Sequence, residues 1–402
     1  MTIGVRPGRR RLREHLLASG AMTPDWAPAY DAVPRELFLP EVMWPSVEGR
    51  RIVVSRADDP AEWLRWADAD VPITTQWDDG RHDGPERGEL ATSSSSMPGV
   101  VFDMLRELSV FDGARVLEVG TGTGWCAALL SARLGEDNLA SIEIDKAVAK
   151  TARTALAAAG WHPRLVVGDG LLGWPERAPY DRILVTAGVR EVPRSWIEQT
   201  RPGGVLVMPW GPAFTDQNAL VRLVVDGDGA AGGRFVGPTR FMHVRSQRGE
   251  WPRHRDYLPN GRPADTREST TSLTAADVLS DDSYAAVDFV LGLLMPECVY
   301  THGRSPRGTM TVWLYGLGDL SWAAVYFNED DPSASRVSQG GPRSLWDEAE
   351  AAHRWWSERG RPGHEEFGLT VTADGRQRVW LGDPSALIPQ AEAVTGTAAA
   401  IR

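Results

Sequence analysis

The sequence predicts a doubly wound α/β domain with a mostly parallel sheet, followed by an additional α+β domain. Three observations support this fold class. Strand-length apolar segments alternate with helical segments between residues 115 and 208, a glycine-rich turn follows the first of these strands, and the composition changes at residues 247–275. Strands that alternate with helices form a parallel sheet with helices on both faces.

The alternating segment contains five short predicted strands, which are residues 115–119, 139–144, 164–167, 182–186 and 204–208. Predicted helices separate the first three of them, at residues 125–134 and at the Ala-rich residues 147–159. The order of these elements is that of a Rossmann-like domain, in which ligands bind at the carboxyl ends of the strands.

The flanking regions have different patterns. Residues 8–40 have helical spacing, whereas residues 55–92 are rich in Asp, Gly, Pro and Arg and predict a long ordered loop or a pair of short strands. Beyond residue 275, an apolar stretch, two adjacent strands, a helix and a hairpin at Ala373-Asp374-Gly375 are predicted, at residues 285–295, 310–315, 321–327, 345–356 and 367–381.

A chain of 402 residues has room for two or three domains. We expect an N-terminal lead-in and substrate loop at residues 1–90, a cofactor-binding core at 91–246, a linker at 247–275 and a substrate-recognition domain at 276–402. The chain has 17 Trp, most of which we expect in the core and some as platforms for an extended peptide.

Charge and cysteine content narrow the class of protein. The formal net charge is −11, which argues against a nucleic-acid partner because such proteins carry a basic face. The two cysteines are far apart, so neither a disulfide framework nor a metal site is expected. No apolar run approaches the ~18 residues that a membrane span requires. We therefore expect a cytoplasmic protein that binds neither metal, membrane nor nucleic acid.

Acidic residues accompany the turns after three successive strands. Glu118 precedes the glycines in residues 116–124, Val-Leu-Glu-Val-Gly-Thr-Gly-Thr-Gly. Glu143 ends the second strand, and Asp169 follows the third strand between two glycines. A carboxylate at the position of Glu143 can accept hydrogen bonds from both hydroxyls of a ribose, and one at Asp169 can accept from an adenine amino group. Together they predict a site for S-adenosylmethionine.

Two alternatives remain open from these residues alone. Any one of the three turns could be an ordinary βα loop, and a strand that runs into a glycine turn also occurs in dinucleotide-binding folds. Glu118 disfavours a dinucleotide-dependent oxidoreductase, because dinucleotide fingerprints have an apolar strand at this point. His243 is interpreted as a structural residue of the last strand.

Several short motifs resemble one family along residues 10–245. They are Val33-Pro34-Arg35-Glu36-Leu37-Phe38, Ser94-Ser95-Ser96-Met97-Pro98, the glycine turn, Val167-Gly168-Asp169-Gly170, Ala178-Pro179-Tyr180-Asp181, Thr186-Ala187-Gly188 and Arg201-Pro202-Gly203-Gly204. The chain resembles the protein-L-isoaspartate O-methyltransferases, which esterify a side-chain carboxylate of a peptide. Met97 departs from the family pattern, which has Gln or Ala there.

The resemblance implies a class I S-adenosylmethionine-dependent methyltransferase fold and assigns site residues. It makes Ser96 the active-site hydroxyl that holds the substrate carboxylate, with Ser94 assisting. The implied cofactor-binding residues are Ser93, Ser95, Glu118, Gly120, Thr121, Gly122, Glu143, Asp169, Gly170 and Thr186. The serines could instead cap the helix that starts near Pro98, because Ser is a preferred N-cap residue.

The expected chemistry needs no general base, since a carboxylate with a pKa of ~3.9 is already ionised at neutral pH. The sequence shows no catalytic triad, in agreement with this expectation.

The region after residue 250 has no expected counterpart in the compact repair enzymes. Residues 75–80 and 341–346 resemble extended actinobacterial members, which methylate one Asp of a ribosomally made macrocyclic peptide so that it closes to an aspartimide. That resemblance implies a peptide-tailoring enzyme. General repair of isoaspartyl proteins and a non-catalytic binding module are the alternatives, and intact Glu118, Glu143, Asp169 and Ser96 argue against the binding module.

Overall fold

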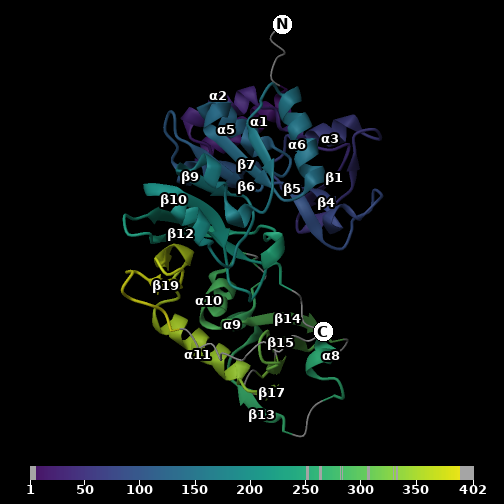
Figure 1. Cartoon of the computed structure of the whole chain (residues 1–402). Coiled ribbons are helices and arrows are strands. Elements are labelled where there is room, and N and C mark those ends of the chain that lie inside the picture. The colour runs from purple at the N-terminus through teal and green to yellow at the C-terminus, as the bar shows by residue number, and fades with distance from the viewer. Residues whose placement is uncertain are drawn as a thin grey trace.

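The protein contains three β-sheets, and helices cover the largest of them on both faces (Figure 1). This computed structural model describes residues 6–249, 253–261, 265–280, 282, 284–305, 308–328, 330–331 and 334–389. No helix among these residues is long and apolar enough to cross a membrane.

The large sheet has nine strands in the order β19-β18-β12-β11-β10-β9-β6-β7-β8. The five strands at one side pair in parallel, as predicted: β6 (Val116–Val119), β7 (Leu139–Glu143), β8 (Arg164–Val167), β9 (Tyr180–Val185) and β10 (Thr200–Trp210). The other four add antiparallel pairs: β11 (Asn218–Val225), β12 (Ala231–Thr239), β18 (Phe367–Val371) and β19 (Gln377–Leu381). The predicted class is confirmed, with a sheet that is mixed.

Alternate residues of the central strands point to two different cores, as the period of two in a strand requires. Leu184 and Val207 pack with the N-terminal helices, whereas their neighbours Ile183 and Leu206 pack with the C-terminal region. The helices of the first side are α1 (Pro7–Ala18), α2 (Ala27–Ala32), α4 (Pro98–Leu108) and α5 (Trp125–Leu134). Both α6 (Lys146–Ala158) and α7 (Arg194–Glu198) also flank this sheet.

A second sheet lies at the N-terminal end. For residues 55–92, where a long ordered loop or a pair of short strands was predicted, the structure has a helix and strands that belong to this sheet. It contains β1 (Val42–Val47), β2 (Arg50–Arg51), β3 (Val54–Ser55), β4 (Ile73–Trp77) and β5 (Ala91–Ser95). Its own small core includes Trp63 of α3 (Pro60–Ala67), a helix that the composition did not predict. Because β5 pairs with β4, the serine run belongs to this sheet and leads directly into α4.

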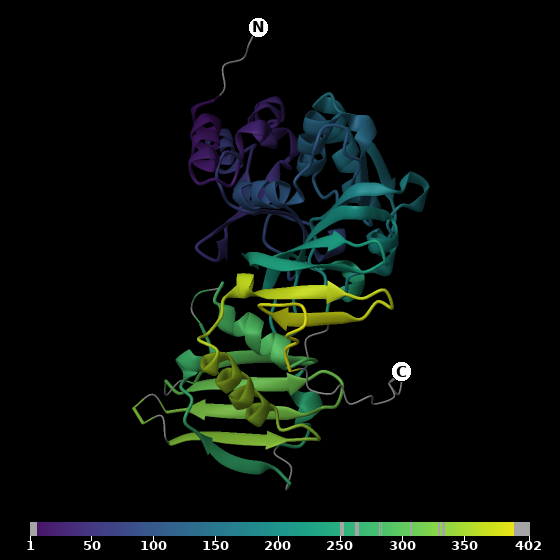
Figure 2. The ribbon, with the colours of Figure 1, turned by 90° about the vertical axis from the view of Figure 1, so that its left-hand side faces the viewer.

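The third sheet is antiparallel, in the order β13-β17-β16-β15-β14. Its strands are β13 (Arg267–Thr271), β14 (Cys298–Arg304), β15 (Met310–Gly316), β16 (Trp322–Phe327) and β17 (Ser335–Gly340). Figure 2 shows α10 (Ala286–Leu294) and α11 (Leu345–Glu358) on one face of it. The apolar stretch, the two adjacent strands and the helix predicted here are confirmed.

Two segments differ from their sequence-based assignment. The expected linker at residues 247–275 contains α8 (His254–Tyr257) and the edge strand β13, and α9 (Ala275–Val278) begins at its last residue. The first four residues of β13 are polar and exposed, so this strand shows no apolar periodicity. The predicted hairpin of β18 and β19 exists, but it pairs with β12 and so extends the large sheet (yellow in Figure 2). This pairing covers the edge of β12, which would otherwise present unpaired backbone groups.

Candidate active site

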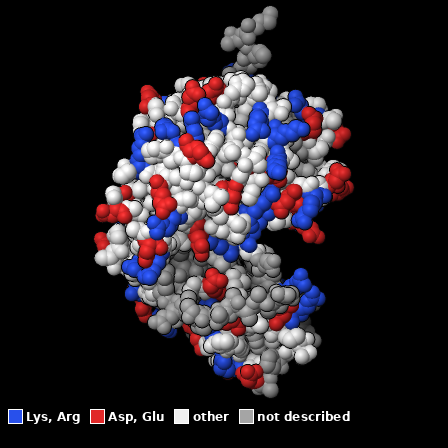
Figure 3. Space-filling model, viewed as in Figure 1, with Lys and Arg blue, Asp and Glu red and all other residues white. Residues whose placement is uncertain are grey.

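A pocket of about 960 Å³ lies at the carboxyl ends of the parallel strands. The second sheet, the glycine turn and the C-terminal region all contribute to its wall, the last through Tyr284, Val299 and Leu317. In the space-filling view the molecule is indented between the part that contains β1 and β4 and the part that contains β14 (Figure 3). The pocket is therefore large enough, and open enough, for a nucleoside cofactor and part of a peptide.

The glycine turn at one end of the pocket depends on the absence of side chains. Gly120 has φ of 95°, and a Cβ added there would lie 2.8 Å from Oγ1 of Thr186. Thr186 donates its hydroxyl hydrogen to the carbonyl oxygen of Gly120. Gly170 faces the same region, where an added Cβ would lie 2.4 Å from Cγ1 of Val119. The family resemblance had implied Gly120, Thr186 and Gly170 as cofactor-binding residues, but not Val119. These four residues line the pocket together with Gly122.

Glu143 and Asp169 stand at the ends of β7 and β8 and both line the pocket. The Glu143 carboxylate accepts hydrogen bonds from the backbone N–H of Gly122 (2.9 Å) and of Asp145 (3.0 Å). Burial raises the pKa of Glu143 above its ordinary value, although these two donors oppose the rise. Asp169 is exposed and accepts from the backbone N–H of Leu171 at 3.0 Å. Each carboxylate retains acceptor capacity for a ligand.

Glu118 lies under the turn and is not among the residues that line the pocket. Its side chain is fully buried and accepts a hydrogen bond from the Ser141 hydroxyl at 2.5 Å, while the Ser141 and Thr121 hydroxyls are 2.6 Å apart. Burial raises the pKa of Glu118 to about 7, against the hydrogen bond from Ser141. Glu118 is thus placed to hold Thr121 through Ser141.

The four serines of the run have different surroundings. The hydroxyl groups of Ser94 and Ser96 have no hydrogen-bond partner among the described residues, and both residues line the pocket. Ser93 accepts a hydrogen bond from Thr75 (3.3 Å), and Ser95 is buried and accepts one from Arg35. No serine caps α4: the N-cap residue is Met97, which makes no side-chain cap.

Arg35 fixes the backbone of this run, a role that its motif alone did not reveal. The buried guanidinium donates to the Ser95 hydroxyl and to the carbonyl oxygens of Ser95 and Ser96, at 3.0 to 3.1 Å. It also donates to the carbonyl oxygens of Ala69 and Val71. Burial lowers the pKa of Arg35 to about 10, so the group stays a cation near neutral pH. These contacts leave Ser96 at the pocket surface with its hydroxyl free.

Ion pairs connect the second sheet to the pocket wall. Asp79, with φ of 54°, pairs with Arg245 at 3.1 Å and with Arg248 at 2.9 Å. Arg245 also pairs with Asp145 at 2.6 Å. Burial opposes ionisation of Asp145, but hydrogen bonds from Arg245 and other donors keep its pKa below the ordinary value. None of these partners was predicted, because residues 79, 145 and 248 come together only in the fold.

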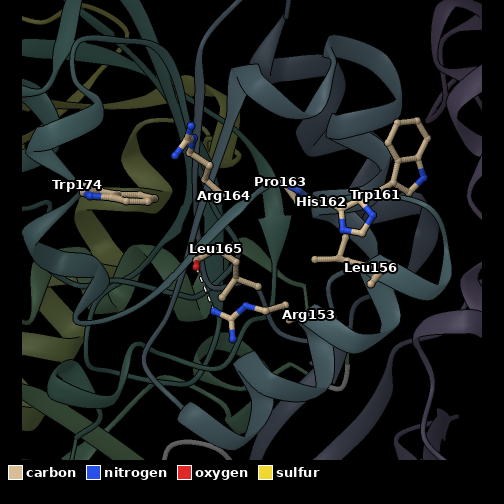
Figure 4. A pocket seen from close by; sticks show the side chains of 9 residues that line it. Arg153, Leu156, Trp161, His162, Pro163, Arg164, Leu165 and Trp174 are labelled. Carbon is tan, nitrogen blue, oxygen red and sulfur yellow. Dashed lines mark hydrogen bonds between the residues drawn. The ribbon is translucent and has the colours of Figure 1, made fainter.

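A smaller cavity of about 380 Å³ lies at the edge of the large sheet, between α6 and β8 (Figure 4). Trp161, His162 and Trp174 contribute to its wall, and Arg153 donates to the carbonyl oxygen of Leu165 at 3.2 Å. None of the predicted site residues lines this cavity. The larger pocket is therefore the candidate active site.

Comparisons with known proteins point to the same chemistry. The family model for protein-L-isoaspartate(D-aspartate) O-methyltransferase matches residues 68–249. A protein-L-isoaspartate O-methyltransferase of Methylorubrum populi is 39% identical over 190 residues, which cover 47% of this chain and 81% of that protein. One of Hyperthermus butylicus is 31% identical over 255 residues, which cover 61% of this chain and 91% of that protein.

A solved structure named protein-L-isoaspartate O-methyltransferase shares the fold, with a TM-score of 0.54 at 24% identity. The alignment covers 93% of this chain and all of that one. The C-terminal region thus has a structural counterpart in a protein of that name. Its presence does not distinguish peptide tailoring from repair, contrary to the expectation from the sequence.

Proposed function

The chain belongs to the protein-L-isoaspartate O-methyltransferase family of S-adenosylmethionine-dependent carboxyl O-methyltransferases, and we propose that it methylates one Asp side chain in a ribosomally made macrocyclic peptide. The ester then closes to an aspartimide. The assignment of the methyl-transfer site rests on the hydroxyl groups of Ser94 and Ser96, which have no hydrogen-bond partner in the described part of the chain. Both residues line the same pocket as Glu143 and Asp169.

The residues divide into two groups in this proposal. Ser96 holds the substrate carboxylate, and Ser94 assists it. The cofactor lies against the glycine turn and the ends of the neighbouring strands, where it contacts Gly120, Thr121, Gly122, Glu143, Asp169, Gly170 and Thr186. Ser93 and Ser95 belong to this cofactor group and also line the pocket, where their side chains contact Thr75 and Arg35. Glu118 supports the same group from beneath the turn, through Ser141.

S-adenosylmethionine supplies an electrophilic methyl group on its sulfonium sulfur. The Ser96 hydroxyl orients an already ionised carboxylate towards that position, and the walls of the pocket exclude water. A bond forms between a carboxylate oxygen and the methyl carbon while the sulfur–carbon bond breaks, which leaves S-adenosylhomocysteine. The backbone nitrogen of the following residue then attacks the ester carbonyl, releases methanol and closes the five-membered ring.

Tailoring of a peptide is supported by the resemblance of residues 75–80 to the extended actinobacterial members. Trp77 lines the pocket, and Asp79 connects the same segment to Arg245 and Arg248 in the pocket wall. General repair of isoaspartyl proteins is the alternative.

The test incubates the full chain with labelled S-adenosylmethionine and two peptides in parallel: a generic isoaspartyl peptide, and an Asp-containing macrocycle encoded beside the gene. We expect the macrocycle to gain the mass of one methylene and then to show a product that is one water lighter than the starting peptide. Label on the isoaspartyl peptide alone would instead establish repair.

Ser96→Ala tests the assignment of the hydroxyl. We expect kcat to fall about 10- to 100-fold, the effect of one lost hydrogen bond in the transition state, with unchanged cofactor affinity. Ser269→Ala is the matched control, since Ser269 is exposed on β13. An unchanged kcat in Ser96→Ala would remove Ser96 from the mechanism.

A further inference from the structure

Five arginines line the pocket of a chain whose net charge is −11, and two of them have no carboxylate partner among the described residues. Arg240 pairs with Asp216 at 3.1 Å, and Arg245 and Arg248 form the pairs described above. Among the residues that the structure describes, Arg51 and Arg190 form no ion pair; Arg51 instead lies over the ring of Trp77 and donates to Thr74. Arg190 is therefore the pocket cation with the least compensation.

Hydrogen bonds to its backbone N–H and carbonyl groups hold Arg190 in place, while its guanidinium group has no hydrogen-bond partner among the described residues. Its N–H donates to Oε1 of Gln247 at 2.7 Å, and its carbonyl oxygen accepts from Gln377 at 2.9 Å. Nε of Arg190 is buried and has no hydrogen-bond partner in the described part of the chain. Burial lowers the pKa of Arg190, yet a guanidinium remains charged in proteins. A half-buried cation without a partner is costly, and a carboxylate matches its planar set of donors.

His243 presents a second donor to the same pocket. The backbone N–H of Phe241 donates to Oδ1 of Asn218 at 3.1 Å, which fixes the orientation of that amide. Nδ2 of Asn218 then donates to Nε2 of His243 at 3.3 Å, so the ring hydrogen is on Nδ1. Burial, with a smaller effect of Arg190, lowers the pKa of His243 to about 4, and the ring is neutral at pH 7. Nδ1 of His243 has no partner among the described residues.

We propose that Arg190 and His243 form a subsite for a second carboxylate of the peptide substrate, one that is not methylated. This rests on the proposed function and adds a substrate class to it: peptides with an acidic residue close to the reacting Asp. Such a subsite supplies a bidentate guanidinium contact and one neutral N–H donor, the combination that suits a carboxylate.

The position of the pair favours the peptide over the carboxylate of the cofactor. The proposed cofactor contacts lie at the ends of β6, β7 and β8 and at Thr186, which follows β9. Arg190 lies four residues beyond Thr186, close enough to Glu297 of the C-terminal region for that carboxylate to act on its pKa. His243 follows β12, in the stretch of pocket wall that also includes Arg240 and Met242.

The experiment measures steady-state methylation by the full chain of matched peptides that differ at one position flanking the reacting Asp, either Glu or Gln. We expect the wild-type protein to show a KM about tenfold lower for the Glu peptide, the typical effect of one charge-assisted hydrogen bond. In Arg190→Gln the KM of the Glu peptide rises to that of the Gln peptide, while kcat and the KM of S-adenosylmethionine stay unchanged. Arg190→Lys recovers part of the preference.

Two further variants separate the subsite from a structural role. His243→Phe keeps a planar ring but removes the N–H, and we expect it to reduce the preference for the Glu peptide by a smaller factor. Arg194→Gln is the matched control, because Arg194 is exposed on α7 and pairs with Glu198. Equal loss of activity on both peptides in Arg190→Gln would show a structural role and overturn the proposal.

Three other outcomes also overturn it. A raised KM for S-adenosylmethionine in Arg190→Gln would assign the subsite to the cofactor. Equal methylation of the Glu and Gln peptides by the wild-type protein, at every flanking position, would refute the subsite and leave the proposed function intact. Methylation of neither peptide would refute both.

Discussion

Substitution of Arg35 tests how the N-terminal region controls the active site. Arg35 is 4% exposed and donates to five acceptors, of which three belong to Ser95 and Ser96. In Arg35→Lys an ammonium group offers three donors from one point, so at least two of the five buried acceptors lose their partner. Each lost contact of this kind costs about 1–3 kcal/mol, and the loss of two is expected to destabilise the protein by about 2–6 kcal/mol.

The same substitution is expected to lower kcat, because the carbonyl groups that anchor Ser96 lose their donor. A displacement of Ser96 of about 1 Å is sufficient to reduce the rate on the order of 100-fold. The assays are urea denaturation followed by Trp fluorescence, and methyl transfer at saturating cofactor. Cofactor affinity should change little, since Arg35 is not among the residues that line the pocket.

Arg9→Lys is the matched control. Arg9 is also a buried arginine that donates to backbone carbonyl groups, those of Tyr30 and Asp31, but it does not contact the serine run. We expect Arg9→Lys to lose stability with little loss of kcat. If Arg35→Lys and Arg9→Lys lost stability to the same degree and both kept the wild-type kcat, the positioning role of Arg35 would be refuted.

Three further predictions concern the cofactor side of the pocket. Glu143→Ala removes the acceptor of the Gly122 N–H and should raise the KM of S-adenosylmethionine at least about tenfold, with wild-type affinity as the contradicting result. Gly120→Ala should abolish cofactor binding in a calorimetric titration, because its Cβ would require both a left-handed backbone and displacement of Thr186; retained binding would show that the turn tolerates a side chain. The pKa of Glu118 is raised to about 7 in the folded protein. The contribution of this group to stability is therefore complete below its ordinary pKa and is lost as the pH rises through 7. Between pH 4.5 and pH 8, the free energy of unfolding of Glu118→Gln should increase by about 3 kcal/mol relative to that of the wild type. A pH-independent difference between the two proteins in urea denaturation would contradict that assignment.

The sequence determined the part of the fold whose signal is local. The strand and helix after the glycine turn have their predicted positions, since apolar periodicity and glycine turns act within a few residues. The same is true of Glu143 and Asp169, which the order of βα units brings to one edge of the sheet. The resemblance to one family then identified the chemistry, which the comparisons confirm.

The tertiary structure decided which of these side chains remain available to contact a ligand in the pocket. Ser94, Ser95 and Ser96 are adjacent residues of the same type, which the sequence pattern does not distinguish. The pairing of β4 with β5 and the contact with Arg35 determine which of their hydroxyl groups remain without a partner in the described part of the chain. The orientation of His243 likewise depends on Asn218, 25 residues away, and the hairpin of β18 and β19 joins a sheet that is more than 100 residues distant in sequence. Such long-range pairings depend on the closure of large loops and on the burial of side chains from separate segments, and no local pattern in the chain encodes them.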